Sequence, residues 1–275
     1  MNRSELVLLI VTAMWGFTFP AMKVSLDYTP PILFLVYRFG IASLLMVIIF
    51  RSRVLKRETL REGFLLGLTL FFGHGFQIVG LKYTTASNSA FITSLYVVFT
   101  PFIAYLLLGE RIKARDLLSL GIALTGLYLI SGANSKVGYG DFLTALCAVS
   151  FAFQIVLVQR FGENDYLSLA FWQIFWNFLL SLIFALLFEP KVFPREVLPW
   201  LGLIYTAVFG TVIAFTLQVK YQRHTTAYKA ALIYSMEPIF GSLSAFMLLG
   251  ERFTRRALAG AFLILAGVWN EIRKN

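Results

Sequence analysis

Residues 84–111 read TTASNSAFITSLYVVFTPFIAYLLLGER and residues 225–252 read TTAYKAALIYSMEPIFGSLSAFMLLGER, so the second stretch repeats the first after 141 positions. Across residues 77–126, 18 of 50 aligned positions are identical at this shift without a gap. The identities include the polar run Leu-Gly-Glu-Arg, which an apolar composition does not explain. The sequence therefore predicts that the chain arose by internal duplication.

The composition of the whole chain indicates a membrane protein. Of its 275 residues, 59% are hydrophobic and 14% are charged, whereas a soluble domain has about 45–50% apolar and about 25% charged residues. A single cysteine excludes a disulfide framework and a cysteine-rich metal site. These values exclude an ordinary soluble enzyme and a disordered chain, and they favour a polytopic membrane protein.

Ten apolar stretches are candidates to cross the bilayer, which takes about 20 apolar residues in a helix. The predicted spans are 5–25, 31–50, 62–81, 87–108, 116–131, 139–160, 166–188, 197–219, 227–249 and 255–272. Their connections are short, so no soluble domain is expected. We interpret the first span as a retained helix, because its apolar run continues through Trp15 with no signal-peptide cleavage site after it.

The repeat and the basic residues together predict the topology. Residues 1–132 and 133–275 each hold five predicted helices, and an odd number means that the second copy enters the membrane from the opposite side. With the N-terminus inside, 15 of the 24 Lys and Arg residues fall in cytoplasmic segments, which predicts that both termini are cytoplasmic. The basic group at 252–256 opposes this rule, and the inverted repeat accounts for it. The net charge of +10 then belongs to a basic membrane face rather than to a nucleic-acid site.

The repeated Gly-Glu-Arg motif has a structural interpretation. Gly109 and Gly250 are expected to end the fourth and ninth spans in a left-handed conformation. Glu110 and Glu251 are then expected near the start of the following helices, where a negative charge suits the helix dipole.

Several motifs carry a resemblance to a known family. They are Trp15-Gly16-Phe17-Thr18-Phe19 with Lys23, Ser94-Leu95-Tyr96-Val97-Val98-Phe99-Thr100-Pro101, Leu108-Gly109-Glu110-Arg111, Glu237-Pro238-Ile239-Phe240 and Leu249-Gly250-Glu251-Arg252. With these motifs the whole chain resembles the EamA family of the drug/metabolite transporter superfamily. The resemblance implies a secondary carrier of small metabolites, often an exporter, whose members handle amino acids, aromatic compounds or choline-like cations.

The resemblance also implies that spans 1, 3, 4, 6, 8 and 9 surround a central cavity, with spans 5 and 10 as peripheral scaffold. The Trp-Gly pair of the first span has no counterpart in the sixth, which reads Val149-Ser150-Phe151. We therefore expect an all-α integral membrane protein of ten helices in two inverted repeats, with an asymmetric central cavity.

Polar and aromatic side chains at mid-depth are the candidates for substrate binding, because polar groups inside a bilayer are costly. At a rise of about 1.5 Å per residue, Trp15, Tyr96 and His74 lie roughly 14–18 Å into their helices. The predicted substrate-binding residues are Trp15, His74, Gln77, Tyr96, Gln218 and Tyr234. For His74 the alternative is a buried hydrogen-bonding role. For the glutamines it is bonding between neighbouring helices.

Glu237, Arg38 and Pro238 are the predicted coupling or gating residues. Glu237 is the one carboxylate at mid-depth in the predicted spans, and burial disfavours its charged form, so it could bind and release a proton. Pro238 could kink the helix at a gate. The alternative for Glu237 is a structural ion pair with Arg38. An ion pair that breaks during transport would be compatible with both the coupling role and the structural role.

The sequence thus predicts a secondary active transporter of small metabolites, acting by alternating access in the cell inner membrane. Its expected partners are a small-molecule substrate, the lipid bilayer and a coupling proton, as a monomer or homodimer, and no nucleic acid. An uptake carrier and a facilitator or channel are the alternatives. An enzyme is disfavoured because no nucleophile–base cluster is present. The sequence offers no metal-ligating cluster, and no cofactor is expected.

Overall fold

The computed structural model describes residues 2–111, 113–131, 138–250 and 254–273, and every regular element within them is helical. The helices are α1 (Arg3–Gly16), α2 (Thr18–Ser25), α3 (Pro31–Phe50), α4 (Leu60–Tyr83), α5 (Ala86–Thr93), α6 (Tyr96–Leu108), α7 (Ala114–Ser131), α8 (Tyr139–Arg160), α9 (Tyr166–Phe188), α10 (Val197–Ala207), α11 (Ala214–Gln222), α12 (Ala227–Tyr234), α13 (Glu237–Leu249) and α14 (Arg255–Ile272). Two 3₁₀ turns, η1 (Arg51–Val54) and η2 (Arg57–Thr59), follow α3. A π-helical segment, η3 (Val208–Ile213), joins α10 to α11.

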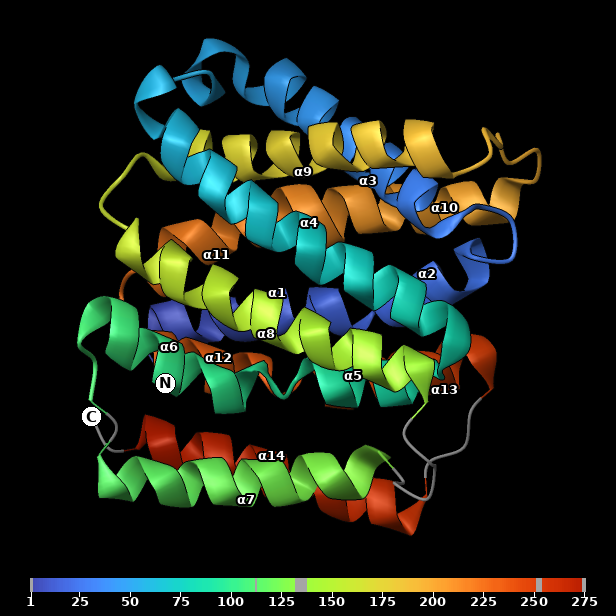
Figure 1. Cartoon of the computed structure of the whole chain (residues 1–275). Coiled ribbons are helices and arrows are strands. Elements are labelled where there is room, and N and C mark those ends of the chain that lie inside the picture. Colours follow the sequence, from blue (N-terminus) through green and yellow to red (C-terminus); the bar gives the residue numbers. More distant parts are fainter. Residues whose placement is uncertain (1, 112, 132–137, 251–253, 274–275) are drawn as a thin grey trace.

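These elements form one bundle with its long helices roughly aligned, and α7 packs on α14 along one side (Figure 1). Within the described residues, eight spans are long and apolar enough to cross a membrane, and 116–130 is a shorter apolar helix. The chain is therefore an all-helical, multi-pass membrane protein. Helices lie at the positions of the predicted spans to within a few residues, and the largest extensions are around 51–61.

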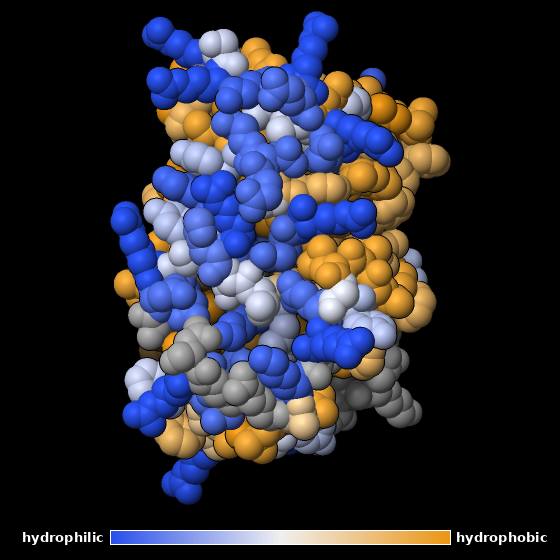
Figure 2. Space-filling model, turned by 90° about the vertical axis from the view of Figure 1, so that its left-hand side faces the viewer, coloured by the Kyte–Doolittle hydropathy of each residue, from blue (hydrophilic) through white to orange (hydrophobic). Residues whose placement is uncertain are grey.

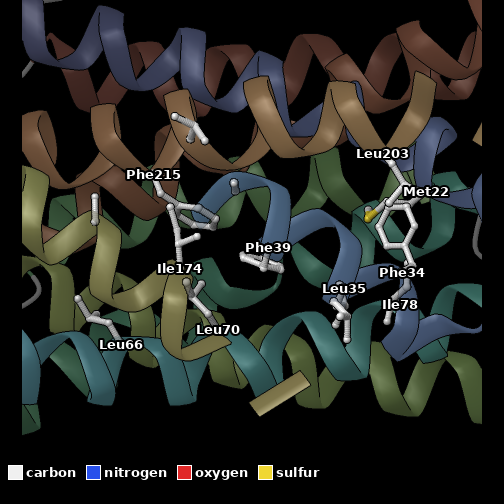
Figure 3. Packing of buried hydrophobic residues seen from close by; sticks show 14 of the residues in the cluster. Met22, Phe34, Leu35, Phe39, Leu66, Leu70, Ile78, Ile174, Leu203 and Phe215 are labelled. Carbon is white, nitrogen blue, oxygen red and sulfur yellow. The ribbon is translucent and has the colours of Figure 1, made fainter. Parts of the chain in front are cut away.

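The surface and the interior of the bundle match a bilayer environment. Large apolar side chains such as Leu106, Leu187 and Phe262 are mostly exposed, and hydrophilic residues gather on the end of the bundle where α1 begins (Figure 2). Inside, Met22, Phe34 and neighbouring apolar side chains pack between α2, α3, α4 and α10 (Figure 3). This packing fixes the helices that surround the centre of the molecule.

Four of the spans are interrupted, which the continuous apolar runs of the sequence did not predict. α1 ends at Gly16 before α2, and the π-helical segment η3 separates α10 from α11. Two residues separate α5 from α6, and two separate α12 from α13. The breaks at 94–95 and 235–236 are 141 residues apart, so they are equivalent in the two repeats. Pro238 lies in the first turn of α13, where a proline costs little. The span is therefore broken at residues 235–236, just before Pro238, and Pro238 does not kink a continuous helix.

The helix caps repeat in the same way as the breaks. Thr85 and Thr226 are N-caps whose hydroxyls accept hydrogen bonds from backbone N–H groups three residues later. Gly109 and Gly250 end α6 and α13 with φ angles of 70° and 68°, so the left-handed caps predicted from the sequence are confirmed. The segments α5–α6 and α12–α13 run in opposite directions along the bundle (Figure 1). The duplication is thus visible as a two-repeat fold.

The expected place of Glu110 at the start of the next helix is wrong. α7 begins only at Ala114, and the backbone of Ala227, the first residue of α12, acts on the carboxyl group of Glu110. Burial raises the pKa of Glu110, and the backbone N–H of Ala227 in the other repeat offsets part of the rise. Glu251, for which the same was expected, lies outside the described residues.

Lys23 ties the first span to the end of α4. Its ammonium group donates to the carbonyl oxygens of Leu81 and Thr84 at 2.7 and 2.8 Å, where the helix dipole also favours a cation. We expect Lys23→Met to destabilise the purified protein by about 2 kcal/mol, as for lost hydrogen bonds to a charged group, seen as a lower thermal unfolding midpoint.

Lys82→Met is the matched control, because Lys82 is an exposed lysine in the last turn of α4, the helix whose end Lys23 contacts. Equal unfolding midpoints for the two variants would contradict a capping role for Lys23.

Candidate functional site

A cavity of about 40 Å³ lies at the centre of the bundle. Eight of the nine predicted site residues line it: Trp15, Arg38, His74, Gln77, Tyr96, Gln218, Tyr234 and Glu237. Pro238 is not among the lining residues. The cavity also touches Thr18, Leu70, Phe151, Gln154, Ile155 and Phe215. It is much smaller than the roughly 300–1,000 Å³ of a typical ligand site.

Aromatic rings form the wall of this cavity. The Trp15 ring lies 5.6 Å from Phe215 and 5.2 Å from Tyr234, measured between centroids. The His74 ring lies 5.0 Å from Phe151 and 5.9 Å from Phe215. His74 and Phe215 are equivalent residues of the two repeats, so the wall is built where the repeats meet.

Glu237 lies at the same meeting point. Its carboxylate accepts a hydrogen bond of 3.4 Å from the hydroxyl of Tyr96, and residues 96 and 237 are also repeat equivalents. Glu237 is the first residue of α13, directly after the break, and 6% of it is exposed. A first-turn position favours a negative charge because of the helix dipole. The break therefore brings a helix N-terminus and a carboxylate to the centre of the membrane protein.

Arg38 of α3 reaches the cavity from the side and is 1% exposed. Its guanidinium donates to the Thr211 hydroxyl at 2.9 Å and to the Gly210 carbonyl at 3.2 Å. Within the part of the chain that the structure describes, no carboxylate oxygen lies within 4 Å of it. The ion pair with Glu237 that the sequence left open is therefore not formed in this conformation, although both residues line one cavity.

Amide side chains close one side of the cavity. Gln154 and Gln218 exchange hydrogen bonds of 3.1 and 3.0 Å, and Gln218 donates to Gln222 at 3.2 Å. Gln222 also accepts from the hydroxyl of Tyr234 at 3.1 Å. On the first-repeat side, Gln77 donates to the Thr93 hydroxyl at 3.4 Å. Gln77 and Gln218 are thus engaged with other helices as well as lining the cavity.

His74 has a local hydrogen bond. Its Nδ1 lies 3.0 Å from the carbonyl oxygen of Leu70, and because a carbonyl only accepts, Nδ1 carries a proton. Among the described residues, no group of three or more His, Cys, Asp and Glu side chains could hold a metal ion. His74 therefore contributes an aromatic, hydrogen-bonding side chain to the cavity wall.

Among the contributors that were not predicted as site residues are Phe151 and Thr211. Phe151 stands where Trp15 does in the first repeat, since the capping pairs Asn2 with Glu5 and Gly138 with Asp141 are offset by 136 residues. Thr211 belongs to the π-helical segment, whose apolar sequence carries no signal for that geometry beyond Gly210.

Comparisons with known proteins agree with this architecture. Residues 2–132 and 138–270 match the family described as "EamA-like transporter family". An "Uncharacterized transporter" of Archaeoglobus fulgidus is 38% identical over 266 residues, which cover 96% of this chain and 84% of that protein. A "Probable amino-acid metabolite efflux pump" of Salmonella typhimurium is 27% identical over 277 residues, which cover 95% and 92%. A solved crystal structure superposes with a TM-score of 0.81 at 21% identity, covering 98% of this chain and 96% of that one, and it supports the fold.

Proposed function

Because this chain belongs to the EamA-like transporter family, and is therefore a membrane transporter, we propose that it exports small metabolites, amino acids first among them, by alternating access. The observation that carries this proposal is the small central cavity, which combines aromatic walls, amide groups, Arg38 and Glu237. Trp15, His74, Gln77, Tyr96, Gln218 and Tyr234 would contact the substrate.

The proposed mechanism uses two inverted halves, 1–132 and 133–275, in which α7 and α14 would be the fifth and tenth spans. Inverted repeats allow one half to rock against the other around a fixed central site. The contacts between equivalent residues, Tyr96 with Glu237 and His74 with Phe215, support an axis through the cavity. A cavity too small for an amino acid supports a carrier that opens to each side in turn, rather than a continuously open channel.

Glu237 is proposed to couple transport to protons. It lies at a helix break, so movement of α13 would change its exposure to the two sides of the membrane. Arg38 and Pro238 would act with it, Pro238 by fixing the start of α13. The basic face at the N-terminal end supports cytoplasmic termini in the cell inner membrane, so protons entering would drive metabolites out.

The direct test uses the full-length protein in proteoliposomes, as a monomer or homodimer, loaded with a mixture of unlabelled amino acids. We expect saturable counterflow of a labelled amino acid and no uptake in protein-free vesicles. Continuous, non-saturable conductance would instead indicate a channel, and accumulation in the direction of the proton gradient would indicate an uptake carrier. Absence of flux for every solute class tried would contradict the proposal.

A further inference from the structure

The guanidinium of Arg38 is held in an unusual way for a charge at this depth. Its three described hydrogen-bond acceptors are the Thr211 hydroxyl, the Gly210 carbonyl and the Met22 sulfur, at 2.9, 3.2 and 3.6 Å. All three are neutral. A buried charge with only neutral partners is costly, and in a membrane protein it marks a functional group by default.

The π-helical segment creates the partners of Arg38. The carbonyl of Gly210 accepts from Arg38 and also from Nε1 of Trp15 at 3.1 Å, so the backbone there serves side chains of two other helices. Thr211 donates its own hydroxyl to the carbonyl of Thr206 at 2.9 Å, which fixes the oxygen that receives Nε of Arg38. π-helical turns of this kind occur frequently at functional sites. The orientation of the guanidinium is therefore built into the fold.

The donor count leaves room for one more partner. A guanidinium has five N–H groups, and its contacts use Nε and one N–H on each terminal nitrogen. Within the described residues, the second N–H on each terminal nitrogen has no acceptor. Two such N–H groups match the two oxygens of a carboxylate, which guanidinium binds in a bidentate fashion. Since Arg38 lines the cavity, a solute in the cavity can supply those oxygens.

Among the described residues that line the cavity, one carries a carboxyl group, and it does not contact Arg38. Glu237 is hydrogen-bonded to Tyr96, and its carboxylate lies more than 4 Å from the guanidinium. Because Arg38 and Glu237 do not pair with each other, each is available to bind the opposite charge of a zwitterionic solute. We propose that Arg38, oriented by Gly210 and Thr211, binds the carboxylate of the substrate and so selects amino acids against amines; this rests on the proposed transport function.

The test compares probes that differ in one charged group. Phenylalanine, phenethylamine and 3-phenylpropionate share the phenyl group, and leucine with its decarboxylated amine gives a second pair. Competition with counterflow in proteoliposomes measures the preference of each variant for the amino acid over the matched amine. For the unsubstituted protein we expect a preference of at least about tenfold, the effect of a charge-assisted hydrogen bond.

Three variants locate this preference. Arg38→Gln is expected to bring the ratio of amino acid to amine close to one, while the affinity for phenethylamine changes little. Arg38→Lys keeps the charge without the bidentate geometry, so it should retain part of the preference. Thr211→Ala removes the hydroxyl that orients Nε and should give an intermediate ratio. Thermal unfolding and monodispersity establish that each variant is folded.

The outcomes separate this assignment from the transport function. Saturable flux in which amines move as well as amino acids, or an unchanged preference in Arg38→Gln, would overturn the role of Arg38 and leave the transporter intact. If Arg38→Gln does not fold, an unchanged preference in both Arg38→Lys and Thr211→Ala overturns it equally. No saturable flux of any probe, whether amino acid, amine or acid, would contradict both proposals.

Discussion

Replacing Glu237 with Gln is expected to abolish proton-driven accumulation of substrate while leaving counterflow measurable. Glutamine has nearly the shape of glutamate and can still accept a hydrogen bond from Tyr96, whose hydroxyl lies 3.4 Å from the carboxylate. It cannot bind and release a proton. The variant should therefore exchange substrate across the membrane but should not concentrate it against a gradient.

The measurement is accumulation in proteoliposomes under an imposed pH gradient. One pH unit supplies about 1.4 kcal/mol per proton, so a carrier with one proton per substrate should reach up to about tenfold accumulation. For Glu237→Gln the expected ratio of inside to outside concentration is one. Glu62→Gln is the control, because Glu62 belongs to α4 but not to the central cavity. Unchanged accumulation and unchanged counterflow in Glu237→Gln would rule out the coupling role.

The sequence predicts the spans and the cavity residues for different physical reasons. The spans are predicted from hydropathy averaged over about 20 residues, and this average does not change when the helix is locally broken. The cavity residues are predicted from their depth in the membrane, since Trp15, Tyr96 and Glu237 are polar or amphipathic side chains far from either end of a predicted span. Eight of the nine predicted site residues line one cavity, although their contact with substrate stays a prediction.

What the sequence does not predict is local geometry that depends on partners from other helices. The apolar run through Val208–Ile213 is the same whether it forms an α-helical or a π-helical turn, and the choice coincides with Arg38 and Trp15 binding to Gly210. Glu110 illustrates the same limit, because the backbone group that lowers its pKa, at Ala227, belongs to the other repeat. Such contacts are set by tertiary packing, which no short-range pattern encodes.

The two repeats share a fold but not the chemistry of their equivalent positions. Tyr96 faces Glu237, and His74 faces Phe215, so each pair places different groups on the two sides of the axis. In the pair Tyr96 and Glu237, only the second-repeat residue is a carboxylate. Among the described residues that line the cavity, Glu237 is the one carboxylate, and it belongs to α13 rather than to α6.

Gly16→Val is expected to prevent stable folding, because α1 crosses α13 too closely for a side chain. A Cβ at Gly16 would lie 2.5 Å from the Cβ of Phe240 and 2.9 Å from the carbonyl oxygen of Glu237. The Ser244 hydroxyl also donates to the Gly16 carbonyl at 3.3 Å, which holds the two helices together. Overpacking typically costs about 1–3 kcal/mol, and a clash with backbone atoms leaves little room for relief.

The readouts are the yield of monodisperse protein and the thermal unfolding midpoint, with counterflow measured on any folded fraction. Gly121→Val is the matched control, because a Cβ there meets nothing within 4 Å. Gly16→Ala should fall between the two, since it adds the clashing Cβ without further atoms. If Gly16→Val matched Gly121→Val in yield and midpoint, α1 and α13 could not pack as closely as described. The position of Glu237 beside the first span would then need revision, since its carbonyl is part of that crossing.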